Sequence, residues 1–302
     1  MSRKKIQTIG CIVKHKHEAA ASLAKELVHV AWHAQKKIVF ANESRALAKR
    51  IQKGTKKTIS ILPKKQLITA CDLILVLGGD GTFLSIARLM EPRSIPLVGI
   101  NLGRLGFLTE IKQTEAILVL ESLLELWPPT IIIRQRPLLS VRVKRGKKII
   151  FSGLVVNDAV ISKGAIARII GLDIWVNNSW VNNIRADGLI LSTTTGSTAY
   201  ALAAGGPILD PALEGLVLAP ICAHSLTLRP LVLPDTVEIR IKLVDRPGHV
   251  YLTLDGQDAF DLKENDEVFI ERFTKHNLQI IGSPNRDFFA LLREKLKFGA
   301  RE

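Results

Sequence analysis

The sequence predicts an α/β domain followed by a mostly antiparallel β domain. Strand-like and helix-like segments alternate up to about residue 133, which is the pattern of a parallel sheet covered by helices. Beyond that point, short strands follow one another and are separated by turn residues. An apolar fraction of 47% over 302 residues is enough for two packed cores. We therefore expect one domain over 1–133 and a second over 134–275.

The first domain is expected to alternate strands with helices. The run Leu73–Leu77 is apolar throughout, which is typical of a strand buried on both faces of a parallel sheet. Ligands bind at the carboxyl ends of such strands. The expected strands are Thr8–Val13, Lys37–Phe40, Leu73–Leu77 and Pro96–Ile100, and the expected helices are His17–Gln35, Ser44–Lys53, Phe83–Met90 and Thr114–Leu126.

The second domain is expected to consist of strands joined by tight turns, such as those at Arg145-Gly146 and Asn177-Asn178. One short helix near Ser197–Ala204 interrupts it, and an amphipathic helix is expected at Arg286–Lys297. The expected strands are Leu138–Val143, Lys148–Val156, Ala159–Ser162, Ile169–Val176, Gly188–Ser192, Val237–Leu243 and Val250–Leu254.

The net charge of +14 means that the chain attracts polyanions such as nucleotides and nucleic acid. A nucleic-acid-binding module is one candidate, but such modules interleave basic with aromatic residues. Aromatic residues are 5% of the chain and form no such stripe. No apolar run approaches the about 20 residues of a membrane span. We therefore expect that the protein binds neither nucleic acid nor a membrane. Cys11, Cys71 and Cys222 suggest no disulfide framework, so we expect it in the cytoplasm.

The first candidate motif is Gly78-Gly79-Asp80-Gly81, between a buried strand and a helix. Glycines let backbone N–H groups approach a phosphate closely, and a helix N-terminus favours negative charge. Asp80 would repel a bare phosphate, so its presence indicates a base beside phosphates rather than a plain phosphate cradle. The structural alternative is a tight turn in which Asp80 caps the helix.

Three further motifs are rich in polar residues. The loop Asn101–Glu110 either presents Arg104 to a phosphate or is structural. The pair Asn157-Asp158 interrupts an apolar run and suits ribose hydroxyls and a base edge, unless it forms an exposed turn. The block Asp187–Pro207 joins a strand to a helix through a hydroxyl-rich loop, which either holds a nucleotide or only caps the helix.

These motifs, in this order and with a late Asp255-Gly256-Gln257, resemble those of the NAD kinases over roughly residues 70–260. The resemblance implies transfer of the γ-phosphate of ATP to the 2′-hydroxyl of the adenosine ribose of NAD, giving NADP. It implies a Rossmann-like α/β domain, a β-sandwich-like NAD-binding domain, and a C-terminal segment, 276–302, that packs back on the first domain. It also implies Mg²⁺ or Mn²⁺ held mainly through the ATP phosphates, and a homodimer or homotetramer.

The resemblance also implies roles for individual residues. Asp80 would accept the proton of the 2′-hydroxyl. Arg185 resembles the basic residue of bacterial members that prefer ATP to polyphosphate. The residues implied to bind NAD or nucleotide are Gly78, Gly79, Gly81, Asn157, Asp158, Arg168, Arg185, Asp187, Ser197, Thr198, Ala199, Tyr200, Ala201, Leu202, Ala203 and Gln257.

A second enzyme class shares the glycine-rich turn, namely the lipid kinases of the diacylglycerol and sphingosine type. Such an enzyme needs an apolar pocket for an acyl chain and usually a face that binds a membrane. The sequence contains no basic amphipathic helix with exposed aromatic residues, which disfavours this alternative.

Overall fold

The computed structural model describes residues 6–14, 18–53, 55–125, 131–164, 168–246 and 248–298. The chain forms two compact units, which we describe separately. The first comprises residues 1–135 and 278–302, and the second comprises residues 136–277. Within the described ranges, no helix is long and apolar enough to cross a membrane.

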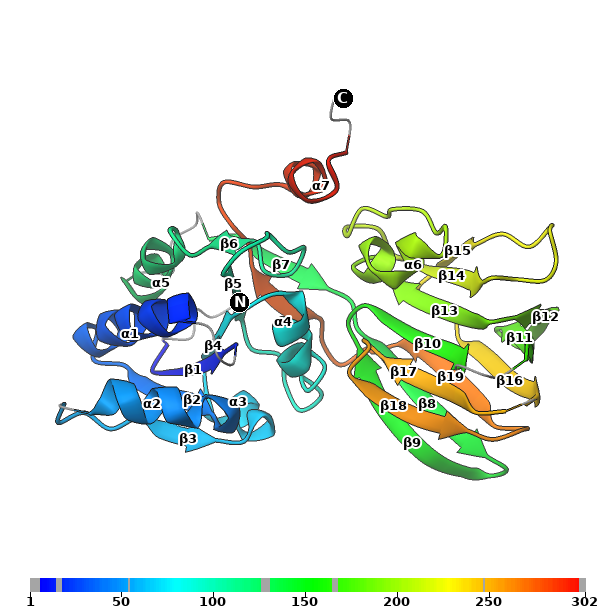
Figure 1. Ribbon diagram of the computed structural model, residues 1–302, viewed down its shortest axis with the longest axis horizontal. Helices are drawn as coiled ribbons and strands as arrows, with labels where there is room; N and C mark the ends of the chain where they lie inside the picture. The colour runs from blue at the N-terminus through cyan, green and yellow to red at the C-terminus, as the bar shows by residue number, and fades with distance from the viewer. Residues whose placement is uncertain are drawn as a thin grey trace. The chain divides into compact units, whose positions relative to one another are not determined.

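The first unit is built on a largely parallel sheet with the strand order β3-β2-β1-β4-β5-β20-β7, and β6 pairs with β5 (Figure 1). The expected α/β fold is confirmed, because the order 3-2-1-4-5 is that of a doubly wound Rossmann-like sheet. Its strands are β1 (Thr8–Val13), β2 (Lys37–Ala41), β3 (Ser60–Leu62), β4 (Leu73–Leu77), β5 (Leu97–Asn101), β6 (Ile111–Lys112), β7 (Ile133–Arg136) and β20 (Leu278–Ile281).

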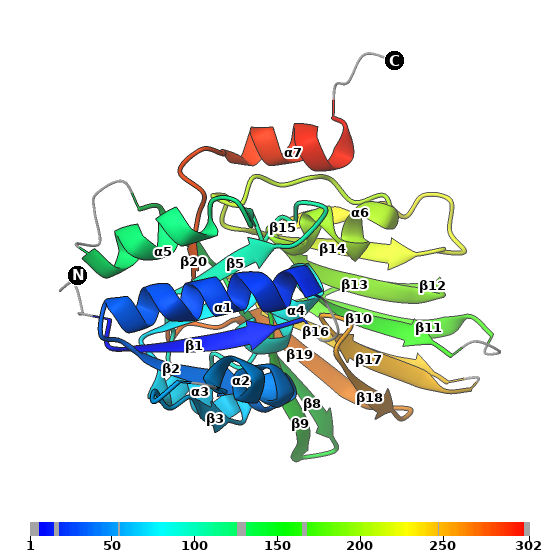
Figure 2. The same ribbon diagram turned by 60° about the vertical axis from the view of Figure 1, so that its left-hand side comes forward.

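Helices cover this sheet and bury its apolar strands. Figure 2 shows α1 lying along β1, and α1 also packs against α5. Alternate residues of β4 join the core formed with these helices, and the residues between them are buried as well. The helices are α1 (Glu18–His33), α2 (Arg45–Gln52), α3 (Lys64–Ala70), α4 (Asp80–Ala87), α5 (Ala116–Glu125) and α7 (Phe288–Leu296), with a 3₁₀ turn, η1, at Asn42–Ser44.

The C-terminal segment returns to the first unit, as expected. Strand β20 pairs in parallel with β5, with Ile280 opposite Leu97, and α7 follows it. The expected helix Phe83–Met90 is shifted: α4 begins at Asp80 and ends at Ala87. The reason is that the chain turns into the helix directly after Gly79, whose extended backbone ends the preceding turn.

The second unit consists of two antiparallel sheets with the orders β15-β14-β13-β10-β17-β18 and β12-β11-β16-β19-β8-β9. Apolar residues of both sheets, such as Val141 and Leu189, share one core, which confirms the β-sandwich-like expectation. The strands are β8 (Leu139–Arg145), β9 (Lys148–Val155), β10 (Asp158–Lys163), β11 (Ile170–Val176), β12 (Ser179–Ala186), β13 (Gly188–Thr193), β14 (Gly215–Ile221), β15 (Leu231–Pro234), β16 (Ile239–Asp245), β17 (Val250–Leu254), β18 (Asp258–Leu262) and β19 (Glu267–Arg272).

The helical insertion of the second unit follows β13. A 3₁₀ turn, η2 (Gly196–Thr198), leads into the single-turn helix α6 (Tyr200–Ala203). The continuous helix expected from Ser197 is therefore split. Ala199, at φ −102° and ψ −127°, is not helical and separates the two turns.

Candidate active site

Asp80 is the first residue of α4, directly after the Gly78-Gly79 turn at the carboxyl end of β4. Glycine is required at Gly78, because a β-carbon there would lie 2.6 Å from Thr82 Oγ1. Beside Gly79 and Gly81, by contrast, no heavy atom lies within 4 Å of an added β-carbon. The backbone of the turn is thus open to a ligand at these two positions.

The carboxylate of Asp80 is held by the neighbouring loop and not by its own helix. Oδ1 accepts hydrogen bonds from the backbone N–H of Leu108 at 3.1 Å and of Thr109 at 3.0 Å. It also accepts one from Thr109 Oγ1 at 2.9 Å, while Phe107 N donates to Oδ2 at 3.0 Å. Asp80 is the first residue of α4 and makes no cap bond to it, so the helix-cap alternative was wrong.

The loop Asn101–Glu110 therefore acts as a cradle for Asp80. A β-carbon at Gly106 would overlap Asp80 Oδ1, so only glycine allows this close approach. Asn101 Nδ2 donates to Thr109 Oγ1 at 3.1 Å, and both of these side chains are buried. The contacts of the loop give it a structural role, while Arg104 is exposed, so its guanidinium stays available to a phosphate.

Lys295 on α7 also contacts Asp80, and the sequence motifs gave no sign of this. Its Nζ donates to Asp80 Oδ2 at 3.0 Å and lies 4.5 Å from the centroid of the Phe107 ring. Burial raises the pKa of Asp80, but the charge and hydrogen bond of Lys295 and the bonds from Thr109 and Leu108 outweigh it, so that the pKa is lowered. The carboxylate is therefore ionised at neutral pH.

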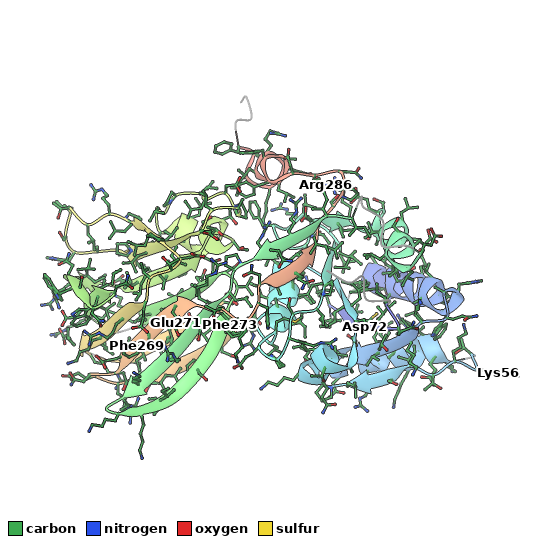
Figure 3. All side chains as sticks on the ribbon, turned by 180° about the vertical axis from the view of Figure 1, so that it is seen from behind. Lys56, Asp72, Phe269, Glu271, Phe273 and Arg286 are labelled. Atoms are coloured by element: carbon green, nitrogen blue, oxygen red, sulfur yellow. The ribbon has the colours of Figure 1, made fainter. Side chains whose placement is uncertain are left out.

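Arg286, which is labelled in Figure 3, lies on the returning C-terminal segment and ties it to the same loop. Its guanidinium donates to the carbonyl of Glu110 at 3.1 Å and to Glu115 at 2.8 and 3.0 Å. Arg134 on β7 makes a bidentate pair with the buried carboxylate of Glu110, at 2.8 and 3.1 Å. Two arginines from distant parts of the sequence thus fix the end of the Asp80 cradle.

In the second unit, Asp255 holds the backbone of Asn157-Asp158. Its Oδ1 accepts from the N–H of Asn157 at 2.7 Å and of Asp158 at 3.1 Å, and its Oδ2 accepts from Val156 N at 2.9 Å. Asp255 has a left-handed backbone, with φ +51°, and Gly256 follows with φ +61°. Burial and the nearby Asp255 charge raise the pKa of Asp158 from 3.8 to about 7.

The block Asp187–Pro207 packs against the same pair of residues. Strand β13 places Ser192 opposite Asp158, and Thr193 Oγ1 donates to the carbonyl of Val156 at 2.6 Å. A β-carbon at Gly196 would overlap the carbonyl oxygen of Asn157. The structure therefore brings the third motif, the fourth motif and the Asp255 turn together, and Asn157-Asp158 is not an exposed turn.

The hydroxyl-bearing residues of this block divide into two groups. Ser197 is fully buried and already hydrogen-bonded within the fold: it donates to Thr194 O at 2.7 Å and accepts from Leu209 N at 3.0 Å. Thr194 Oγ1 and Thr195 Oγ1 are buried without a hydrogen-bond partner. These two threonines lie in the block Asp187–Pro207 but are not among the residues expected to bind NAD, although an unsatisfied buried hydroxyl is a candidate contact for a ligand.

The remaining expected residues of the block differ in exposure. Thr198 Oγ1 donates to Thr195 O at 3.2 Å, and Ala201 is fully buried. Tyr200 is 46% exposed, so its ring is available to a ligand. Ala199 and Leu202 are half-buried, and Ala203 is exposed.

The expected peripheral residues lie around these clusters. Asp187 pairs with Lys163 at 2.8 Å, and Gln257 and Arg168 are exposed. Arg185 is on β12 and approaches Asp245 at 3.6 Å, whereas Asp158 begins β10 in the other sheet. The expected site residues thus form one cluster around Asp80 in the first unit and one around Asn157-Asp158 in the second.

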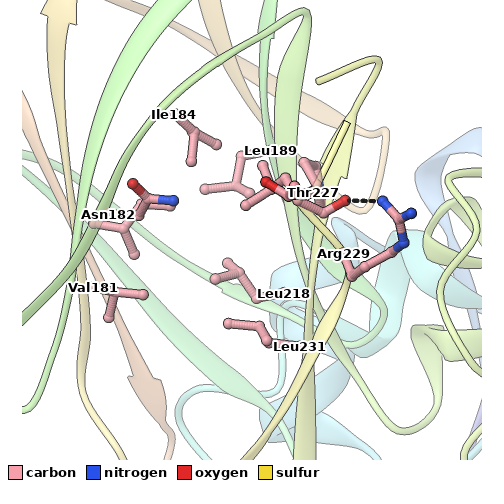
Figure 4. A pocket seen from close by; sticks show the side chains of 11 residues that line it. Val181, Asn182, Ile184, Leu189, Leu218, Thr227, Arg229 and Leu231 are labelled. Atoms are coloured by element: carbon pink, nitrogen blue, oxygen red, sulfur yellow. Dashed lines mark hydrogen bonds between the residues drawn. The ribbon is translucent and has the colours of Figure 1, made fainter. Parts of the chain in front are cut away.

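No group of three or more His, Cys, Asp or Glu side chains among the described residues could hold a metal ion. An apolar pocket of about 210 Å³ lies in the second unit, lined by Ile184, Leu189 and Leu218 among others (Figure 4). None of the expected site residues lines it.

Comparison with protein families gives two matches that together span most of the chain. The model of the ATP-NAD kinase N-terminal domain matches residues 9–126, and that of the ATP-NAD kinase C-terminal domain matches residues 156–281. An NAD kinase of Geobacter metallireducens is 47% identical over 230 residues, covering 76% of this chain and 80% of the relative. An NAD kinase of Solibacter usitatus is 41% identical over 299 residues, covering 98% of this chain and 99% of the relative.

Solved structures agree with these matches. The crystal structure of yeast NADH kinase complexed with NADH has a TM-score of 0.89 at 25% identity, covering 99% of this chain and 90% of the other. An NAD kinase from Archaeoglobus fulgidus in complex with ATP has a TM-score of 0.73 at 23% identity, covering 95% and 99%. At 23% identity, the similarity to the Archaeoglobus fulgidus structure supports only the fold.

Proposed function

This chain belongs to the ATP-NAD kinase family, and from that premise we propose that Asp80 accepts the proton of the hydroxyl group that receives phosphate. The enzyme phosphorylates NAD to NADP with ATP. The acceptor is the 2′-hydroxyl of the adenosine ribose, and the γ-phosphoryl group is transferred. The observation that supports Asp80 is its fixed, ionised carboxylate at the carboxyl end of β4.

The lowered pKa of Asp80 makes it a weak base, which fits the chemistry of this transfer. Phosphoryl transfer passes through a loose transition state, in which the attacking oxygen has formed little of its new bond. A hydroxyl loses its proton readily only as that bond forms. Asp80 therefore first orients the hydroxyl by accepting its hydrogen bond and takes the proton late in the step.

NAD is expected to bind through polar residues of the second unit. The carboxyl of Asp158 and the amide of Asn157 suit ribose hydroxyls and a base edge. Tyr200 offers an exposed ring for stacking on a base, and Thr194 and Thr195 offer unpaired hydroxyls. The proposed set also includes Asp187, Ser197–Ala203 and Gln257. Positive charge at its edge comes from Arg168 and Arg185.

ATP is expected at the glycine turn. The open space beside Gly79 and Gly81 admits phosphate oxygens to the backbone of α4, whose N-terminus favours negative charge. A divalent cation, Mg²⁺ or Mn²⁺, would neutralise phosphate charge. Such a cation would be held mainly through the ATP phosphates.

The test of the Asp80 assignment is Asp80→Asn, with turnover and NAD affinity measured separately. The amide retains an oxygen for the loop N–H groups but cannot take the proton. We expect kcat to fall by about 10²–10⁴-fold, with Kd for NAD changed by only a few-fold. Asp72→Asn is the matched control, since Asp72 accepts from Gln7 N and Thr8 N at the other end of β4 and should retain turnover. Turnover of Asp80→Asn near that of the parent enzyme would refute the assignment.

We also propose that the enzyme acts in the cytoplasm as a homodimer or homotetramer. The assembly is supported by the apolar pocket and by exposed apolar side chains that are next in sequence to residues lining it, Trp180 at 60%, Leu226 at 89% and Val232 at 53%. Such residues are commonly covered by a second subunit. Light scattering during size-exclusion chromatography should give the mass of a dimer or tetramer, and a monomeric mass would contradict the proposal.

A further inference from the structure

The hydrogen-bonding capacity of Asp80 is almost fully used. Three donors of the loop occupy Oδ1, and Oδ2 accepts from Phe107 N and Lys295 Nζ, each at 3.0 Å. A substrate hydroxyl that hydrogen-bonds to Asp80 must therefore take the position of a donor on Oδ2. The N–H of Phe107 is fixed by the backbone, whereas Lys295 Nζ sits at the end of a flexible four-carbon stem. Lys295 is the donor that can move aside.

The helix that carries Lys295 is firmly held. Glu294 pairs with Lys112 at 2.9 Å, and the ring of Phe288 lies 6.4 Å from that of Phe107. The side chain of Asp287 caps the helix by accepting from Ala290 N at 2.7 Å. Because α7 is anchored at both ends, the stem of Lys295 can swing while its backbone stays beside the Asp80 cradle.

The displaced ammonium group would have an anion within reach. The oxygen of a substrate hydroxyl that hydrogen-bonds to Asp80 lies about 2.7 Å from Asp80 Oδ2. In a reactive arrangement the phosphorus atom lies about 3–3.5 Å from the hydroxyl oxygen. The phosphoryl oxygens therefore come within a few ångströms of the present position of Nζ. Gly78–Thr82 itself contains no basic residue to balance their charge.

We propose that Lys295 is a catalytic residue that moves from Asp80 to the γ-phosphoryl group when both substrates are bound. The inference rests on the proposed role of Asp80. In the step, the bond between the 2′-oxygen and Pγ forms, and the bond between Pγ and the β–γ bridging oxygen breaks. ADP leaves with that electron pair, and the hydroxyl proton passes to Asp80 Oδ2. Lys295 stabilises the charge on the phosphoryl oxygens throughout.

The test is Lys295→Met, which removes the ammonium group and keeps an unbranched stem. We expect kcat to fall by about 10²–10³-fold, with KM for NAD changed by only a few-fold. Lys295→Arg, which restores the charge, should recover part of the loss. The acid limb of the kcat/KM profile should also shift to higher pH in Lys295→Met, because the charge of Lys295 no longer lowers the pKa of Asp80.

Lys112→Met is the matched control, since it removes a cation that also holds α7 but does not contact Asp80. Its kcat should stay within about threefold of the parent value. An unchanged or higher kcat in Lys295→Met would overturn the proposal and make Lys295 only an occupant of Asp80. An equal loss in Lys112→Met would also overturn it, because the effect would then come from the position of α7. Failure of the Asp80 assignment is distinguishable, since Asp80→Asn would then turn over normally whatever Lys295 does.

Discussion

Asp158 should make the stability of the protein depend on pH. Its pKa is raised from 3.8 to about 7 by burial and by the charge of Asp255. Between these two pH values the native state holds a proton that the unfolded chain has lost. The stabilisation is therefore complete below about pH 4 and is lost as the pH rises to about 7. Each pKa unit corresponds to about 1.4 kcal/mol, so the loss is a few kcal/mol.

Asp158→Asn tests this dependence. The free energy of unfolding, measured with urea, should be lower at pH 8 than at pH 5 for the parent protein. The difference between the two pH values should be smaller for Asp158→Asn. Asp245→Asn, at an exposed carboxylate of β16, should behave like the parent. Equal losses in Asp158→Asn and the parent protein would show that Asp158 ionises normally in the fold.

Gly106 should be as important to turnover as the residues that it lies against. Its β-carbon in Gly106→Ala would overlap Asp80 Oδ1, so the carboxylate or the loop must move. We expect a stability loss of about 1–3 kcal/mol and a fall in kcat of at least tenfold, since misplacing a reacting group is costly. Gly103→Ala, in the same loop but with no heavy atom within 4 Å of the added carbon, is the control. Similar kinetics for the two variants would refute the close packing at Gly106.

At the scale of elements, the sequence predicted best what is local. The strand Leu73–Leu77 was predicted at its observed bounds, because a strand buried on both faces is apolar throughout. Strand β12 was missed, since this edge strand is largely exposed and polar and lacks the alternation that marks a strand. Strand β20 was also missed, because four residues that join a sheet begun far earlier in the chain carry no local signal.

In the candidate site, too, local features could be predicted and contacts between distant residues could not. The glycine turn and the Asn157-Asp158 pair could be selected from composition and order. The partners of Asp80 could not, because Thr109 is 29 residues away and Lys295 is 215 residues away in sequence. A lysine near the end of an amphipathic helix is ordinarily a surface residue. Only the return of the C-terminal segment to the sheet brings this lysine to Asp80.

At the scale of the whole molecule, the two units differ in how the chain builds them. The second unit is one continuous segment, 136–277, with a core made by its own two sheets. The first unit is discontinuous, and β20 lies between β5 and β7 in its sheet. Residues 1–135 alone would leave β5 without this neighbour and would lack α7. The backbone N–H of Gly282 donates to the carbonyl of Ile132 at 2.8 Å, so the end of β20 lies beside the start of β7.

We therefore expect the fragment 136–277 to fold alone, with the circular dichroism of an antiparallel sheet and one cooperative urea transition. The fragment 1–135 should not fold cooperatively, because β7 loses β20 as its neighbour in the sheet and Arg134 loses its bond to Arg286 O at 2.7 Å. Joining residue 136 to residue 278 through a short glycine-containing turn should restore folding, since β7 ends where β20 begins. Cooperative unfolding of 1–135 by itself would contradict the structural role given to β20. A failure of the joined fragment, with 1–135 also unfolded, would mean that the first unit needs the second in order to fold.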